Sequence, residues 1–139
     1  MIQDEIMRMD ADELVALRSA INERIERIKS ARRQEVTARW ETLAGYMETI
    51  CGYDIRQKCR LRVVTNARYL VFLKMQLEGY TQKDMERASG FDHSTVCYGS
   101  KAIADALKYP CIYPEVAQMD KELTKMMDDE KDMEERQHD

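Results

Sequence analysis

The chain has 139 residues, of which 35% are charged, with a net charge of −4 at neutral pH and only five glycines and two prolines. So few turn-forming residues exclude a many-stranded sheet, and the lack of any run of about 18 apolar residues excludes a membrane-spanning helix. The sequence therefore predicts an all-α protein, located in the cytoplasm.

The charges are distributed unevenly along the chain. Residues 1–50 carry a net charge of −2, residues 51–108 one of +4, and residues 109–139 one of −6. A basic middle segment between two acidic ends is typical of a protein whose middle part meets a polyanion.

The first predicted element is a long helix over residues 10–46, which Asp10 or Asp12 can cap. Large apolar side chains recur near it at intervals of seven residues, at Met7, Leu14, Ile21 and Ile28. The companion positions that a coiled coil requires are weaker, since Arg24 is one of them. Two interpretations stay open: the stripe packs on its own domain, or it pairs with a second chain to give a homo-oligomer.

A basic segment comes after this helix, which we expect to end at Gly52. Residues 55–68 contain five basic side chains and no acidic one: Arg56, Lys58, Arg60, Arg62 and Arg68. Like charges at this density repel one another, and nearby phosphate groups would relieve the repulsion. The alternative is that each of them is an ordinary solvated surface charge.

Three more helices are predicted before Tyr109 and Pro110, which end the last of them. The segment 66–78 is apolar on nearly every side, as a central helix is. A short helix over residues 81–89 ends at Gly90, and Asp92 can cap a longer helix that continues to about Lys108. A short helix joined by a glycine turn to a longer one is the helix-turn-helix pattern.

The longer of these two helices has an apolar side and a polar side. At about 100° per residue, the apolar side contains Val96, Ile103 and Leu107. The opposite side contains Ser94, Tyr98, Lys101 and Asp105. Short polar side chains near the N-terminus of such a helix suit the base edges in the DNA major groove.

The C-terminal segment begins at Pro114 and predicts a helix that packs back on the domain. Its apolar stripe consists of Val116, Met119, Leu123 and Met126. Beyond Met127 the acidic sequence predicts a frayed end. The expected organisation is a long helix over residues 1–39, a helix-turn-helix domain over 40–109, and a C-terminal helix with an acidic tail over 110–139.

Two short motifs lie within residues 54–103. One is Phe-Asp-His-Ser-Thr-Val at residues 91–96, and the other is Lys-Cys-Arg-Leu-Arg at residues 58–62. Together they resemble the C-terminal DNA-binding domain, domain IV, of the bacterial replication initiator DnaA, which has Arg-Asp-His-Thr-Thr-Val and a Lys-Arg-Arg-x-Arg loop. Phe91 and Cys59 stand where that family carries arginines.

The resemblance implies a helix-turn-helix domain that binds double-stranded DNA. Its basic loop implies that Arg60 enters the minor groove, while Lys58, Arg62 and Arg68 contact phosphate or lie close to it. The residues implied to read bases in the major groove are Asp92, His93, Ser94 and Thr95. We expect Lys101 to make a further phosphate contact. The implied setting is the nucleoid, in replication control or transcription regulation, for instance of a mobile element.

Catalysis, a metal, a cofactor and ATP binding are not expected. The chain lacks the Gly-x-x-x-x-Gly-Lys-Ser/Thr loop of ATPases, and its four cysteines have no zinc or redox spacing. His93 has no oxyanion-forming motif beside it; the alternative to a DNA contact is a capping or core histidine. The alternative function is a helical interaction or scaffold protein that retains a helix-turn-helix.

Overall fold

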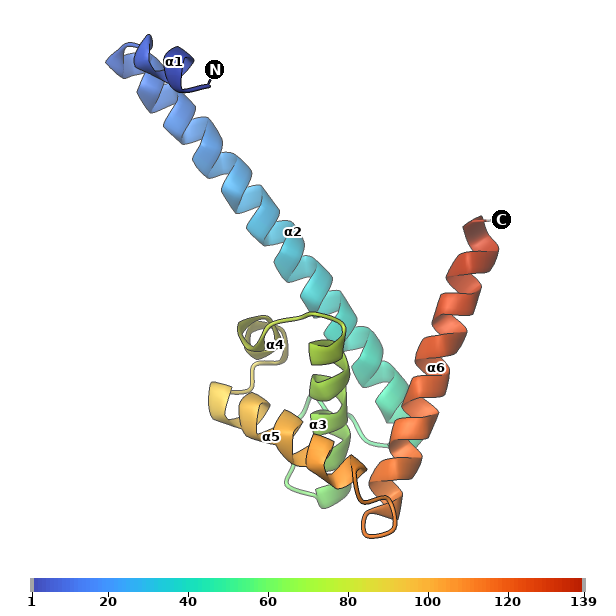
Figure 1. Cartoon of the computed structure of the whole chain (residues 1–139). Coiled ribbons are helices and arrows are strands. Elements are labelled where there is room, and N and C mark those ends of the chain that lie inside the picture. The colour runs from blue at the N-terminus through green and yellow to red at the C-terminus, as the bar shows by residue number, and fades with distance from the viewer. Residues whose placement is uncertain (1, 139) are drawn as a thin grey trace. The chain divides into compact units, whose positions relative to one another are not determined.

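The computed structural model describes residues 2–138, without the side chain of the last of them, and these residues form helices and no strand (Figure 1). The helices are α1 (Ile2–Met7), α2 (Ala11–Cys51), α3 (Arg62–Leu77), α4 (Gln82–Ser89), α5 (His93–Leu107) and α6 (Pro114–His138). The predicted all-α class is confirmed. The chain divides into two compact units, Met1–Glu35 and Val36–Asp139.

The first unit consists of α1 and the part of α2 that ends at Glu35. Asp10 caps α2, because its Oδ1 accepts a hydrogen bond of 2.8 Å from the amide of Glu13. This contact decides between the two caps that the sequence offered. None of the described residues of this unit is buried. The first unit therefore has no apolar core.

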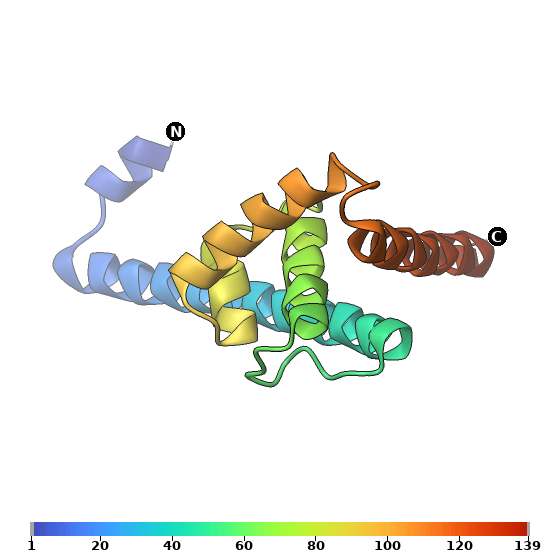
Figure 2. The same ribbon diagram turned by 90° about the horizontal axis from the view of Figure 1, so that it is seen from below.

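The second unit is built around α3. Trp40 of α2 stacks on Phe72 of α3 with ring centroids 5.4 Å apart, and α4, α5 and α6 also pack on α3 (Figures 1 and 2). Helix α3 begins at Arg62, four residues earlier than the sequence predicted. Burial of each large apolar side chain in such a core contributes about 1.5–3 kcal/mol.

The bounds of the second unit differ from the expected domain bounds. The unit begins at Val36 rather than at residue 40, since Val36 is already part of the buried core. It also includes α6, whose residues Val116 and Leu123 are buried in the same core. The C-terminal helix is therefore a structural part of this unit.

The predicted end of α4 at Gly90 and the predicted cap of α5 at Asp92 are confirmed. Thr81 and Asp84 form a reciprocal capping box at the start of α4. Gly90 ends α4 with a φ of 78°, in the left-handed region that favours glycine. Asp92 then caps α5. These local preferences set the short connection between the two helices.

A glycine also lets α5 approach α3 closely. Gly99 lies on the buried side of α5, and a Cβ atom at this position would overlap the ring of Tyr69 in α3. The neighbouring apolar positions of α5, Val96 and Ile103, are buried as predicted. The polar side of α5 consequently points out of the core.

The expected frayed end beyond Met127 is corrected, because α6 continues to His138. The carboxylate of Glu130 accepts hydrogen bonds from Nη1 of Arg39 at 2.9 Å and from the hydroxyl of Tyr46 at 2.6 Å. These contacts bind the acidic part of α6 to α2, a pairing that local charge density did not predict.

The same contacts change the acidity of the groups that make them. Burial alone would lower the pKa of Arg39, but hydrogen bonds and charges from Glu78 and Glu130 raise it above its usual range. Burial and the hydrogen bond to Glu130 raise the pKa of Tyr46 to about 12. Arg39 therefore stays a cation between two carboxylates, and Tyr46 stays neutral at physiological pH.

Candidate nucleic-acid interface

The first turn of α5 holds the residues that were expected to read bases. Oδ1 of Asp92 accepts a hydrogen bond of 2.8 Å from the amide of Thr95. Hydrogen bonds from the Thr95 side chain and amide lower the pKa of Asp92. Thr95 is half-buried, whereas His93 and Ser94 are exposed. Asp92 and Thr95 therefore fix the end of the helix, and His93 and Ser94 are the side chains that it presents.

A residue of α4 lies beside the imidazole of His93. Nδ1 of His93 is 3.5 Å from Oε2 of Glu86, and the His93 side chain is 64% exposed. His93 is therefore neither a core residue nor the helix cap, which is Asp92. The sequence reasoning missed Glu86, because no local signal marks a contact between two helices.

Two exposed cations of the basic segment, Lys58 and Arg62, lie close to α5. Lys58 and Arg60 are exposed in the loop, and Arg62 is exposed in the first turn of α3. The charge of Lys58 contributes to lowering the pKa of Asp92, which places the loop beside the start of α5. Within residues 2–138 the structure shows no hydrogen bond or ion pair of the Arg60 and Arg62 side chains.

Arg56 differs from these cations because acidic side chains surround it. Its Nε donates a hydrogen bond of 2.7 Å to Asp54, and its guanidinium also pairs with Glu41 and Glu48. The hydrogen bond from Arg56 lowers the pKa of Asp54. Arg56 is consequently neutralised locally and adds little to the positive field of the loop.

The expectation that Arg68 contacts phosphate is corrected, because this side chain is only 4% exposed. Its Nε donates to the carbonyl oxygen of Ile55 at 2.9 Å, and its Nη2 donates to that of Gln57 at 2.7 Å. Burial lowers the pKa of Arg68, although an arginine keeps its charge in proteins. Hydrogen bonds to the carbonyls offset the cost of removing the charge from water.

Phe91 covers the buried guanidinium of Arg68. The centre of its ring lies 4.1 Å from Cζ of Arg68, within the range of a cation–π contact. The ring also packs edge-on against Phe72, with centroids 6.3 Å apart. Phe91, which stands where the resembling family has an arginine, therefore joins the turn before α5 to the loop.

A sequence signal for the buried position of Arg68 exists. Arg68 lies on the same side of α3 as Val64, Val71 and Met75, at spacings of four, three and seven residues. All three of those side chains are buried. A cation on such an apolar stripe indicates an internal contact rather than a surface charge.

A groove joins the start of α3 to the exposed side of α5. Arg62 and Asn66 of α3 and Tyr98 of α5 all line it. Tyr98 is 69% exposed and packs edge-on against Tyr69, and Lys101 is exposed one turn further along α5. We call the resulting surface the basic face; it consists of Lys58, Arg60, Arg62, His93, Ser94, Tyr98 and Lys101.

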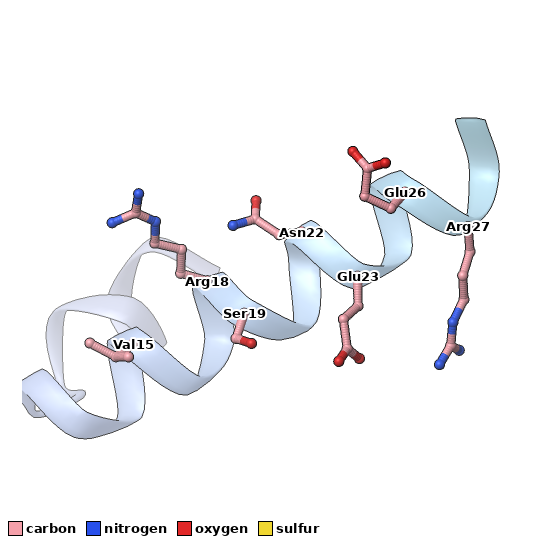
Figure 3. A pocket seen from close by; sticks show the side chains of 7 residues that line it. All are labelled: Val15, Arg18, Ser19, Asn22, Glu23, Glu26 and Arg27. Atoms are coloured by element: carbon pink, nitrogen blue, oxygen red, sulfur yellow. The ribbon is translucent and has the colours of Figure 1, made fainter. Parts of the chain in front are cut away.

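Other kinds of site lack support within the described residues. A shallow hollow on α2 is lined by side chains of that one helix, which cannot enclose a ligand (Figure 3). Residues 2–138 contain no cluster of three His, Cys, Asp or Glu side chains that could hold a metal ion. No helix in this part of the chain is long and apolar enough to cross a bilayer.

Comparisons of the chain with models of protein families, with curated proteins and with solved structures give no match. The chemistry of the basic face is therefore the basis for inferring a function.

Proposed function

We propose that the protein binds double-stranded DNA through the basic face, with α5 in the major groove. The observation that carries the proposal is the groove that joins Arg62 to the exposed side of α5. Arg62 and Tyr98 line this groove, while Val96 and Ile103 on the other side of α5 are buried in the core. A cation beside an exposed helix side can contact a phosphate while the helix reaches the base edges of a groove.

Different residues of the basic face have different roles in the proposed DNA binding. Lys58, Arg62 and Lys101 contact phosphates and supply most of the affinity, which falls steeply with salt because counterions are released. Arg60 enters the minor groove, as the likeness to DnaA domain IV suggests. His93 and Ser94 contact bases, since they are exposed while Asp92 and Thr95 hold the helix cap.

A salt titration with a short duplex tests the affinity part of the proposal. We expect duplex DNA to bind at micromolar concentration or tighter in about 50 mM salt, with a linear fall of log K against log salt. Arg60→Ala should weaken binding about 10-fold. Arg136→Ala, which removes an exposed arginine of α6 outside the basic face, is the matched control and should have little effect.

Selection of bound sequences from a random duplex library tests the specificity part. The double substitution His93→Ala with Ser94→Ala should flatten the selected sequence profile while nonspecific binding persists. Arg62→Ala should instead weaken all sequences about equally and leave the profile intact. A profile that survives the double substitution would show that the first turn of α5 does not read bases.

The biological setting we propose, replication control or transcription regulation, rests on the likeness to the DnaA domain alone. The alternative is a helical interaction protein that keeps the helix-turn-helix as a scaffold. Absence of duplex binding in about 50 mM salt would contradict the DNA-binding proposal and favour this alternative.

A further inference from the structure

The part of α2 before Val36 carries an aliphatic stripe that nothing in the described chain covers. The stripe consists of Leu14, Leu17, Ile21, Ile25 and Ile28. Four of these side chains are between 39% and 56% exposed, and Leu17 is half-buried. At 3.6 residues per turn the five positions fall within an arc of roughly 80°. They therefore form one continuous apolar strip along the helix.

The stripe is distinct from the polar side of the same helix. The hollow in Figure 3 is lined mainly by polar side chains, including Arg18, Asn22, Glu23 and Glu26, and by no residue of the stripe. An amphipathic helix of this kind normally buries its apolar side. In proteins, most of the stability of such a helix comes from packing of its apolar side against another surface. The stripe therefore needs a partner surface.

The spacing of the stripe matches a second copy of itself in the opposite direction. Counted from Ile21, the next aliphatic positions lie four residues away on both sides, at Leu17 and Ile25, and seven residues away, at Leu14 and Ile28. In an antiparallel pair centred on Ile21, each of the five aliphatic side chains therefore faces an aliphatic side chain of the second copy. Such a self-complementary contact is the interface of a two-fold symmetric dimer.

The charges favour the same antiparallel arrangement. Residues 10–20 carry a net charge of −2 and residues 22–32 one of +2. At the two ends of the stripe stand Asp10 and Arg32, each eleven residues from Ile21. Arg32 has an intrachain contact with Glu35 at 3.6 Å, and a second copy brings Asp10 to the same region. In a parallel pair the acidic halves would face each other, as would the basic halves.

We infer that the protein is a homodimer whose subunits pair antiparallel through residues 10–32, centred on Ile21. The antiparallel orientation also sets the two helix dipoles in opposition, which is favourable. A consequence that rests on the proposed function is that each dimer carries two basic faces, so that DNA with two sites is bound with avidity.

Sedimentation equilibrium of the full chain in the absence of DNA tests the dimer independently of DNA binding. We expect a dimer for the native chain. Ile21→Lys should raise the dimer Kd at least about 100-fold, because each dimer loses two buried isoleucines and gains two facing ammonium groups. The matched control is Val15→Lys, which lies on the same helix outside the stripe and should leave the Kd unchanged.

Either of two results would overturn the dimer: a native chain that is monomeric at about 100 μM, or an Ile21→Lys chain that dimerises as tightly as the native one. Both substitutions lie in the unit without a core, so the helical content of the second unit should be unchanged in circular dichroism. Loss of that content would show instead that Ile21 supports the fold of the chain, which also contradicts the inference.

Oxidative crosslinking tests the orientation. Chains carrying Leu14→Cys are mixed with chains carrying Ile28→Cys, and disulfide-linked peptides are identified by mass spectrometry, so the native cysteines can remain. The antiparallel dimer predicts peptides that link position 14 to position 28. Peptides that link position 14 to position 14 would indicate a parallel pair and contradict the proposed geometry.

Discussion

The two parts of α2 have similar aliphatic content, but they differ in what their side chains contact. From Val36 onward, Trp40, Leu43 and Met47 are buried in the core of the second unit. Before Val36, α2 buries no residue, although its aliphatic stripe is as regular. The comparison teaches that amphipathic periodicity predicts a helix and a contact face, and that the partner of this face can lie inside the chain or outside it.

The sharpest way to break this comparison is to remove one side chain from each part. Trp40→Ala should lower the free energy of unfolding by about 3–5 kcal/mol, because it deletes a buried ring that stacks on Phe72. Val15→Ala should change it by less than about 0.5 kcal/mol, because Val15 is 67% exposed. Urea unfolding followed by circular dichroism measures both, and equal losses would contradict the division into two parts.

A second pair of substitutions extends the comparison to two arginines of the basic segment, one buried and one exposed. Arg68→Met should lower the free energy of unfolding by about 2–3 kcal/mol, since it leaves the carbonyls of Ile55 and Gln57 without their buried donor. Arg60→Met should lower it by less than about 0.5 kcal/mol. The same urea experiment applies, and an unchanged midpoint for Arg68→Met would contradict a structural role for this arginine.

The helix caps provide a third and smaller test. Asp92→Ala should lower the urea midpoint of the second unit, because the amide of Thr95 loses its acceptor. Asp10→Ala removes the equivalent cap in the first unit and should leave that midpoint unchanged. Asp92→Asn keeps an acceptor at the cap and is the control. A fall of the midpoint with Asp10→Ala would show that the two units unfold together.

The smallest expected effect is the contribution of Tyr46 to the pH dependence of stability, which appears only in alkaline solution. The pKa of Tyr46 is about 12 in the folded protein, against 10.0 for an ordinary tyrosine. The folded state therefore binds the proton more tightly, and its contribution to stability is complete below pH 10 and is lost as the pH rises towards 12. Tyr46→Phe should remove this part of the pH dependence in urea titrations at several pH values. An identical pH dependence in both proteins would contradict the contact with Glu130.

Local rules predicted the elements that local chemistry controls. The end of α4 at Gly90 and the cap of α5 at Asp92 were both expected from neighbouring residues, and the structure has them. Long-range contacts could not be predicted in this way. Glu130 belongs to an acidic run that suggests disorder, but Arg39, which is distant in sequence, supplies the opposite charge.

The candidate site was predicted in part for the same reason. Exposed positions such as Arg60, His93 and Ser94 follow from a motif and from helix periodicity. Arg68 points inward because carbonyl groups of an irregular loop accept its hydrogen bonds. No sequence pattern marks those carbonyls, and the motif therefore assigned Arg68 to phosphate. Burial separates Arg68 from the exposed residues of the site, and burial is a property of the whole fold.

The buried guanidinium of Arg68 also has a consequence for the thermodynamics of association. It bonds two carbonyls of the loop and lies under the ring of Phe91, so the loop and the turn before α5 are ordered during folding. An anion that meets the basic face then finds both segments already in place, and little conformational entropy is lost on binding. Replacing Arg68 would transfer that ordering to the encounter itself, with slower association and a larger unfavourable entropy.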